Sequence, residues 1–511
     1  MDGQGDPGLA PTANTNNVHH NKVKPPSVLE KLKSDKAYRG RVIQSLRLAL
    51  SSLTLGVVFG QQGPAFLDLQ IITNTDVETA SAFFTSASCG YMVGSFISGF
   101  VHTKINNNVL MTIVNAGAGA ASIITPHCSP YYLMIIIRFT TNMFCGGIDT
   151  LVNAEHMHIW GSEGRSLLQL IHFTFAFGGV LTPLFTEPFL APKEIKNSNT
   201  EAQIFEFNMT SSELTLNITS NLTSNTSNNN TTVLLPRTTN VHYAFLIGGV
   251  ISILISLHYV VTIFCEKKSK SSSDTHTQSV HDRKLPRPLY VFLILVLCFF
   301  YLVYCCVEDT FASFLMTFVV TEYDSVSKSE GAYITTFYWG SFAVGRFLSI
   351  FVSKYITAMK VVFIYTLFMI VAFAGFTISA TFGHIGLLTT FSCMAGLSLS
   401  AVFAAGFSWT EAELLKVTGW VSSFILIGSS IGMMINPLII GYLMENVSNM
   451  WFCYILLAET LLLCCVFYFL LLFNRCYINK CYGTIGEGRS LEIYVEPPKN
   501  ETELNLMGNV D

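Results

Sequence analysis

The stretch YMVGSFISGF (residues 91–100) returns in outline as YWGSFAVGRF (338–347), and both copies contain GSFxxG. A second pair, LTPL (181–184) and INPL (435–438), repeats in the same way. The copies lie 246 residues apart in the first pair and 254 in the second. Chance could give either match alone, but two matches at nearly one spacing indicate a duplicated unit. The chain is therefore predicted to consist of two similar halves.

Apolar segments long enough to cross a membrane recur along most of the sequence. Half of the 511 residues are hydrophobic and only 12% are charged, whereas about a quarter are charged in soluble proteins. A helix needs about 20 apolar residues to cross a bilayer core of about 30 Å. Twelve such segments are expected, at 43–63, 79–102, 109–126, 131–154, 166–190, 242–264, 288–318, 330–353, 358–381, 384–405, 418–440 and 450–473. The sequence thus predicts an all-α membrane protein with six transmembrane helices in each half.

The basic residues are distributed unevenly between the loops. They gather before the first segment and between the sixth and seventh, and they are absent from the loops after the first, third, ninth and eleventh. Because short loops rich in Lys and Arg stay on the cytoplasmic side, both termini and the central loop are predicted to be cytoplasmic. No cleavable signal peptide is expected, since about 40 polar residues precede the first segment, which then serves as its own insertion signal.

The predicted domain boundaries follow from these segments. A cytoplasmic tail (1–41) precedes the first six-helix bundle (42–264), and a cytoplasmic linker (265–287) leads to the second bundle (288–473) and a second cytoplasmic tail (474–511). Residues 191–241, inside the first bundle, form a polar extracellular loop. Its six sequons predict glycosylation at Asn208, Asn217, Asn221, Asn225, Asn229 and Asn230. The sequons and the basic residues therefore predict the same topology.

The fourth segment ends in a polar stretch, GGIDTLVNAEHMHIWG (146–161). At 100° per residue, six side chains fall within about 60° of one another around the helix: Arg138, Asn142, Asp149, Asn153, His156 and Trp160. An ionised Asp in hydrocarbon costs at least several kcal/mol, so this stripe should face a water-filled cavity or polar partners. Asp149 and Asn153 can offer oxygen ligands to a sodium ion; alternatively, Asp149 carries a proton or only ties two helices together.

Other segments carry donors, acceptors and aromatic faces of the kind that a sugar site uses. Gln169 and His172 lie one turn apart in an otherwise apolar segment, where a buried structural histidine is an equally good interpretation. Glu308 and Asp309 form a second acidic site, with Asp309 free to point elsewhere. The candidates for substrate binding are Gln61, Gln62, Gln169, His172, Glu308, Trp339 and Asn436.

Five stretches together resemble the sodium-dependent glucose transporter family of the major facilitator superfamily. They are GPAFLDL (63–69), IDTLVNAEHMHIWG (148–161), LQLIHFTFAFGGVLTPLF (168–185), EDTFASF (308–314) and WGSFAVGRFLSIF (339–351). Because they come from both halves, the resemblance implies the major facilitator fold, in which two six-helix bundles surround a central cavity.

The resemblance also suggests roles for single residues. The family is distantly similar to the bacterial fucose–proton symporter, in which an acidic residue before a TxxN pattern is essential for coupling. Asp149 takes that role here, because Thr150 and Asn153 complete the pattern. In that symporter an Asp at the end of the first span contributes to coupling and sugar contact, and Asp68 matches it; His172 matches a sugar-contacting Gln.

The function implied is sodium-coupled uptake of glucose or a similar monosaccharide by alternating access. The expected protein is a multi-pass monomer of the plasma membrane whose partners are the sugar, the sodium ion and the lipid bilayer, with no cofactor and no nucleic acid. The residues leave open a proton-coupled or uncoupled facilitator for another small polar solute, such as urea or a polyol, and a non-transporting sensor on a transporter scaffold. An enzyme is disfavoured, because no nucleophile, metal or phosphate motif is evident.

Overall fold

The computed structural model describes residues 32–102, 104–160, 165–193, 238–266, 285–417 and 419–483. The chain falls into two units, Met1–Gln44 and Ser45–Asp511. The described part of the first unit contributes the start of helix α2, and the helices from α3 onward belong to the second unit. The predicted glycosylation sites lie outside the described residues: Asn208, Asn217, Asn221, Asn225, Asn229 and Asn230.

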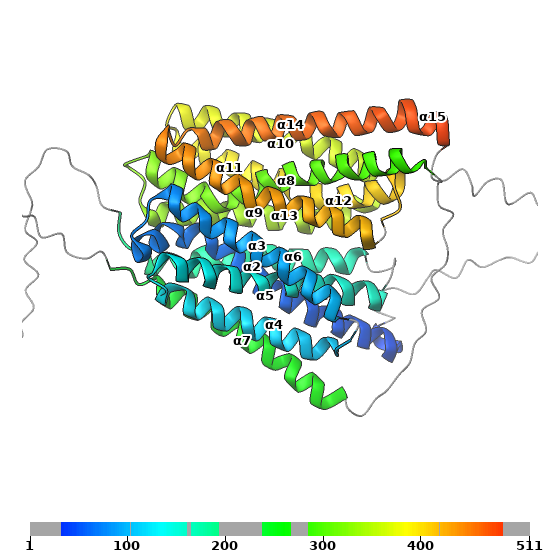
Figure 1. The fold of residues 1–511 in the computed structure, drawn as a ribbon, viewed down its shortest axis with the longest axis horizontal. Coiled ribbons are helices and arrows are strands. Elements are labelled where there is room, and N and C mark those ends of the chain that lie inside the picture. The colour runs from blue at the N-terminus through cyan, green and yellow to red at the C-terminus, as the bar shows by residue number, and fades with distance from the viewer. Residues whose placement is uncertain are drawn as a thin grey trace, which may run out of the picture. The chain divides into compact units, whose positions relative to one another are not determined.

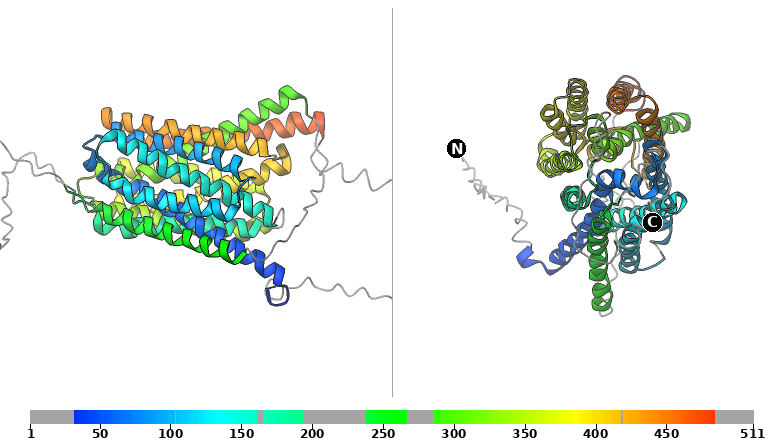
Figure 2. Two further views of the ribbon diagram at one scale, coloured as in Figure 1. Left: turned by 60° about the horizontal axis from the view of Figure 1, so that its bottom comes forward. Right: turned by 90° about the vertical axis from the view of Figure 1, so that its left-hand side faces the viewer.

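Helices make up nearly all of the described chain (Figure 1). The first half contains α2 (Lys36–Thr73), α3 (Val77–Val101), α4 (Asn107–Ile124), α5 (Tyr131–Trp160), α6 (Arg165–Thr186) and α7 (Val241–Glu266). The second half contains α8 (Arg287–Glu322), α9 (Lys328–Tyr355), α10 (Ala358–Thr381), α11 (Ile385–Leu399), α12 (Val402–Trp409), α13 (Gly419–Asn446), α14 (Trp451–Phe473) and α15 (Asn479–Tyr482). Figures 1 and 2 show α4 and α7 on one side of the bundle and α10 and α14 on the opposite side.

Ten helical stretches among the described residues are long and apolar enough to cross a membrane. The two predicted spans outside this set form α3 and α9, which are helices of 25 and 28 residues. These are the two helices that carry the GSFxxG repeat. Each packs against a helix of the other half, so polar side chains on them meet protein as well as lipid. The all-helical prediction is confirmed, while the count of twelve crossings and the side of the termini stay predictions.

The repeated motifs meet in crossed pairs between the two halves. Helix α3 packs against α13, and α9 packs against α6, so each GSFxxG helix lies beside the proline-containing helix of the other half. Pro437 has no N–H to bond the carbonyl of Met433 one turn earlier. That carbonyl accepts a hydrogen bond of 3.1 Å from Ser88 Oγ on α3 instead. The proline thus supplies an acceptor to the contact between the halves.

The two copies of the repeat differ in how tightly their first glycine is packed. A Cβ added to Gly94 on α3 would lie 1.8 Å from the carbonyl oxygen of Met143 on α5, so only glycine permits this approach. A Cβ on Gly340, the matching position on α9, would meet nothing within 4 Å. The close approach of α3 to α5 places Tyr91 of α3 beside Asp149 of α5.

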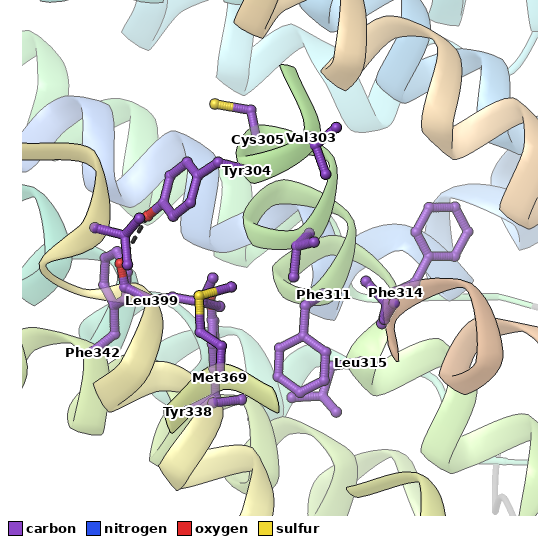
Figure 3. Close-up of a cluster of buried hydrophobic side chains, with 14 of the residues drawn as sticks. Val303, Tyr304, Cys305, Phe311, Phe314, Leu315, Tyr338, Phe342, Met369 and Leu399 are labelled. Carbon is purple, nitrogen blue, oxygen red and sulfur yellow. Dashed lines mark hydrogen bonds between the residues drawn. The ribbon is translucent and has the colours of Figure 1, made fainter. Parts of the chain in front are cut away.

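Helix α8 runs through the core of the second half and is buried on most of its faces. Phe311 lies among aromatic rings there, with centroids 5.1 Å from Tyr338 and 5.2 Å from Phe376. Figure 3 shows this cluster and the hydrogen bond of 2.8 Å from the Tyr304 hydroxyl to the carbonyl of Leu399, where α11 ends. These contacts fix the rotation of α8 and hence the directions of the acidic residues between Tyr304 and Phe311.

Candidate functional site

Asp149 on α5 is held by two neutral partners. The hydroxyl of Tyr91 on α3 donates to its Oδ2 at 2.6 Å, and Nδ2 of Asn153, one turn along α5, donates to its Oδ1 at 3.0 Å. Both carboxylate oxygens therefore have a donor, but neither partner carries a charge. The structure brings Asp149 and Asn153 together, in the positions at which the sequence predicts an ion site.

Glu308 on α8 has a charged partner. Its Oε1 lies 3.4 Å from a terminal nitrogen of Arg346 on α9. The guanidinium of Arg346 also lies over the ring of Phe342, 4.4 Å from its centroid, and near that of Phe175 on α6, at 5.5 Å. The charge of Arg346 acts on Asp149 as well. A single guanidinium thus connects the acidic residues of the two halves electrostatically.

A small cavity lies between the halves, beside this cluster. Its polar lining includes Gln62 of α2, Asn142 of α5 and Asp309 of α8, and the ring of Tyr91 forms part of its wall. Gln62 Nε2 donates to Asn142 Oδ1 over a long distance of 3.5 Å. The cavity has room for about one water molecule, so a hexose would fit there only after the two halves move apart.

Arg138 provides the second buried positive charge of this region. It is 3% exposed, and its Nε has no hydrogen-bond partner among the described residues. Its charge acts on Asp309 across the contact between the halves. The opposite end of the predicted stripe faces another neighbour, because Trp160 Nε1 donates to Ser45 Oγ on α2 at 2.7 Å. The stripe is therefore shared between the cavity and α2.

Gln61 and Gln62, which are neighbours in the sequence, face different surroundings. Gln61 is 2% exposed, and neither of its amide atoms has a hydrogen-bond partner among the described residues. It lies against α7, where a Cβ on Gly248 would be 3.4 Å from its Oε1. Of these two adjacent glutamines, both predicted to bind substrate, the structure places Gln62 at the cavity and Gln61 between α2 and α7.

The candidates on α6 and α9 lie along the second seam between the halves. Ser349 of α9 donates to Gln169 Oε1 at 3.3 Å. Trp339 packs edge-on against Phe175, with centroids 5.9 Å apart. His172 lies within electrostatic reach of Arg346. This group joins α6 to α9 beside the Glu308–Arg346 pair.

Asn436 lies inside the second half, away from the lining of the cavity. Its Nδ2 donates to Thr310 Oγ1 at 2.8 Å and lies 3.3 Å from the carbonyl oxygen of Cys306 and 3.4 Å from Glu459 Oε2. All of these partners belong to α8 and α14. The structure therefore gives Asn436 partners within its own half.

Asp68 lies in a different place from Asp149, at the end of the bundle where α2 ends and α3 begins. We name this the outer end, because the sequence predicts it to be external. Asp68 is fully buried and forms an ion pair of 2.5 Å with Lys328 of the second half. It also accepts hydrogen bonds from the Ala191 N–H, at 2.8 Å, and from the Thr239 hydroxyl. The structure brings Asp68 to Lys328 and to these two loop residues.

Further hydrogen bonds join the two halves at the outer end. Asn446 Nδ2 donates to Glu78 Oε2 at 2.7 Å, and the Val77 N–H donates to Glu445 Oε2 at 3.2 Å. The two halves are therefore in contact at this end.

Asp309, Arg138 and Tyr91 are the residues of this region that the site prediction leaves out. Asp309 directly follows the chosen Glu308, and successive residues on a helix point about 100° apart. Periodicity alone does not tell which of the two carboxylates faces the other half. Arg138 belongs to the predicted stripe, but only the fold shows that its charge acts on Asp309, which is 171 positions away. Tyr91 is the first residue of the repeated stretch, and this position is the only feature of the sequence that marks it.

Comparison with known proteins finds transporters. A family model described as "Sugar (and other) transporter" matches residues 48–156. The chain is 27% identical over 392 residues to the sodium-dependent glucose transporter 1A of Mus musculus, a match that covers 76% of this chain and 87% of that protein. The resemblance seen in the sequence is thus confirmed.

Solved structures show the same arrangement of helices. A variant of the fucose:proton symporter FucP of E. coli gives a TM-score of 0.54 at 15% identity, over 84% of this chain and 98% of that one. The partially occluded inward-open form of the xylose transporter XylE from E. coli gives 0.59 at 10% identity, over 83% and 96%. The fold is that of major facilitator transporters, and the relatives are transporters rather than enzymes, as the sequence predicts.

Proposed function

We propose that this chain, whose fold is that of major facilitator transporters, couples the entry of one sodium ion to the uptake of glucose or a similar monosaccharide across the plasma membrane. The proposal takes its substrate class from the names of the transporters to which the chain is similar. One observation of the structure supports the coupling: Asp149 has only uncharged hydrogen-bond partners, whereas Glu308 is ion-paired. Asp149 is the residue we assign to the ion.

The charges of the central region leave room for one cation. When all of them are ionised, the three carboxylates of Asp149, Glu308 and Asp309 outnumber by one the two guanidiniums that act on them, those of Arg138 and Arg346. One negative charge is then uncompensated, and an uncompensated charge in a buried site is costly. A single monovalent ion at Asp149 removes this cost. Carboxylate and amide oxygens are suitable ligands for such an ion, and Asn153 supplies the amide.

The coupling of one ion to one sugar is energetically sufficient. A monovalent cation moving through about 60 mV and down a tenfold gradient releases roughly 2.8 kcal/mol, which supports about a 100-fold accumulation of the sugar. The transport cycle requires the halves to separate at one end at a time. The hydrogen bonds and the Asp68–Lys328 pair keep the outer end together in this structure. We therefore assign the closed outer end to the stage of the cycle in which the site is shielded from the outside.

The test is uptake of radiolabelled glucose into liposomes that contain the purified chain, in sodium and in choline at a fixed pH. We expect sodium to stimulate uptake and Asp149→Asn to abolish the stimulation, while sodium-independent exchange of sugar across the membrane survives. Asp324→Asn is the matched control, because this carboxylate is 97% exposed and outside the site.

The alternatives give different results in the same experiment. Uptake that is driven by a pH gradient and does not depend on sodium would show that the coupled ion is a proton. Binding of a solute without flux in any gradient would indicate a sensor. Sodium stimulation that persists in Asp149→Asn would remove this residue from the coupling mechanism.

A further inference from the structure

We propose that Asp309 is the residue of the second half that binds a hydroxyl group of the substrate, in the cavity shared with Gln62 and Asn142. The inference rests on the proposed function, because it assigns the contacts of the transported sugar. It places the sugar between the two halves, in a cavity lined by Tyr91, whose hydroxyl donates to Asp149.

The first support is the lining of the cavity. Gln62, Asn142 and Ser88 come from the first half, and Asp309 comes from the second. Asp309 forms no hydrogen bond or ion pair with any residue in the described parts of the chain. A carboxylate accepts hydrogen bonds only, and amides both donate and accept, so together they match the donor and acceptor capacity of a sugar hydroxyl. The long Gln62–Asn142 contact of 3.5 Å is easily exchanged for such a hydroxyl.

The second support is the hydrogen bonding of the two acids, which separates a hydroxyl site from the assigned ion site. Asp309 has no hydrogen-bond donor among the described residues, so both of its oxygens are free to accept from a sugar hydroxyl. Asp149, by contrast, has only neutral hydrogen-bond donors. The two acids thus differ in the ligand that their surroundings favour.

The third support is the shape of the walls. Phe59 and Tyr91 line the cavity and meet edge to face, with centroids 5.8 Å apart. Aromatic walls with a few polar groups are typical of sugar sites, since the C–H faces of the ring pack on the aromatic side chains. The cavity is closed by Met433, whose carbonyl accepts the hydrogen bond of Ser88 from the other half. Separation of α3 from α13 would therefore widen it.

The experiment compares wild type and Asp309→Asn across a panel of singly deoxygenated glucose analogues, each measured as a competitor of glucose uptake. We expect the wild type to bind one analogue about 10- to 100-fold more weakly than glucose, the usual loss for one hydrogen bond to a charged group. Asp309→Asn should weaken the binding of glucose by a similar factor. The variant should then bind glucose and that one analogue equally well, while the ratios for the other analogues stay as in the wild type. General damage would weaken all analogues equally. Asp309→Asn should keep a sodium dependence of uptake, whereas Asp149→Asn should remove it.

Two outcomes overturn the inference and are distinct from failure of the proposed function. The inference is wrong if Asp309→Asn keeps the wild-type ratio for every analogue. If the wild type takes up no glucose in any gradient, the proposed function fails first. In that case the thermal stability of the purified wild type and Asp309→Asn is measured with glucose, fucose, a polyol and urea. A solute that stabilises the wild type and not the variant supports Asp309 as a binding residue, and stabilisation of neither, or of both equally, refutes it.

Discussion

The hydroxyl of Tyr91 donates a 2.6 Å hydrogen bond to Asp149, while the ring of the same residue lines the cavity between the halves. One side chain therefore touches both the assigned ion site and the assigned sugar site. We expect that movement of the ring when a sugar enters the cavity would change the hydrogen bonding of the carboxylate. Coupling between two sites is a free energy that acts equally in both directions, and Tyr91 is placed to carry it.

Tyr91→Phe keeps the ring and its edge contact with Phe59 but removes the donor to Asp149. We expect a folded protein that still takes up sugar, with the effect of sodium on sugar affinity reduced at least fivefold. By reciprocity, the effect of sugar on sodium affinity should fall by the same factor. Both are obtained from half-maximal concentrations measured over a grid of sodium and sugar. An unchanged effect of sodium would show that the hydroxyl only supports the structure.

Glu308→Gln leaves the charge of Arg346 without its partner, and that charge acts on Asp149. We expect the sodium concentration for half-maximal uptake to rise about tenfold, because two like charges several ångströms apart repel each other in a partly buried site. The double variant Glu308→Gln/Arg346→Gln removes both charges and should restore sodium affinity to near the wild-type value. If the double variant is as impaired as the single one, the effect is not electrostatic.

Lys328→Gln leaves Asp68 buried and without a counter-charge. Loss of one partner of a buried ion pair costs about 3–5 kcal/mol, so contact at the outer end should become less stable. We expect Ser88→Cys, at the contact of α3 with α13, to react at least tenfold faster with a membrane-impermeant thiol reagent when Lys328→Gln is added. The parent for both proteins is the same Ser88→Cys chain.

Exchange of the two charges provides a further check on this ion pair. The double variant Asp68→Lys/Lys328→Asp should fail to restore slow labelling, because the Ala191 N–H and the Thr239 hydroxyl also donate to Asp68 and would face a cation. Full restoration would show that the ion pair alone closes the outer end.

Gly94→Ala and Gly340→Ala form a matched pair within the repeat. The added methyl at Gly94 meets the Met143 carbonyl, and we expect it to destabilise the protein by about 1–3 kcal/mol and to lower uptake. The methyl at Gly340 enters open space, and alanine is the better helix former by about 1 kcal/mol, so stability should hold or rise. Thermal unfolding of the two purified variants measures the difference. Equal losses would mean that the two halves pack alike at this motif.

The arrangement of helices could be predicted from the sequence because it depends on patterns that are repeated along the chain. The length of the apolar segments and the two motif pairs are enough for two helical halves. The sequence does not explain why α3 and α9 are more polar than the other spans, because the explanation is their packing against α13 and α6.

The candidate site was predictable where one helix carries the whole pattern. Asp149 and Asn153 lie one turn apart, so their contact follows from helix geometry. The ion pair of Asp68 could not be predicted in this way, because its partner Lys328 lies 260 positions away in the other half. The direction in which Asp309 points depends on the rotation of α8. Aromatic packing around Phe311 fixes this rotation, and the local sequence periodicity does not reveal it.

The crossed pairing of α3 with α13 and of α6 with α9 also bears on the origin of the chain. In each seam the second predicted span of one half meets the fifth predicted span of the other, which is the self-complementary contact of a twofold-symmetric dimer. A six-helix ancestor could thus have assembled with a second copy of itself through two identical seams. Fusion of two such copies would preserve both seams and release each copy from the requirement to stay alike. Gly94 is tightly packed while Gly340 is unconstrained, and Asp149, whose two hydrogen-bond partners are uncharged, lies in the first copy.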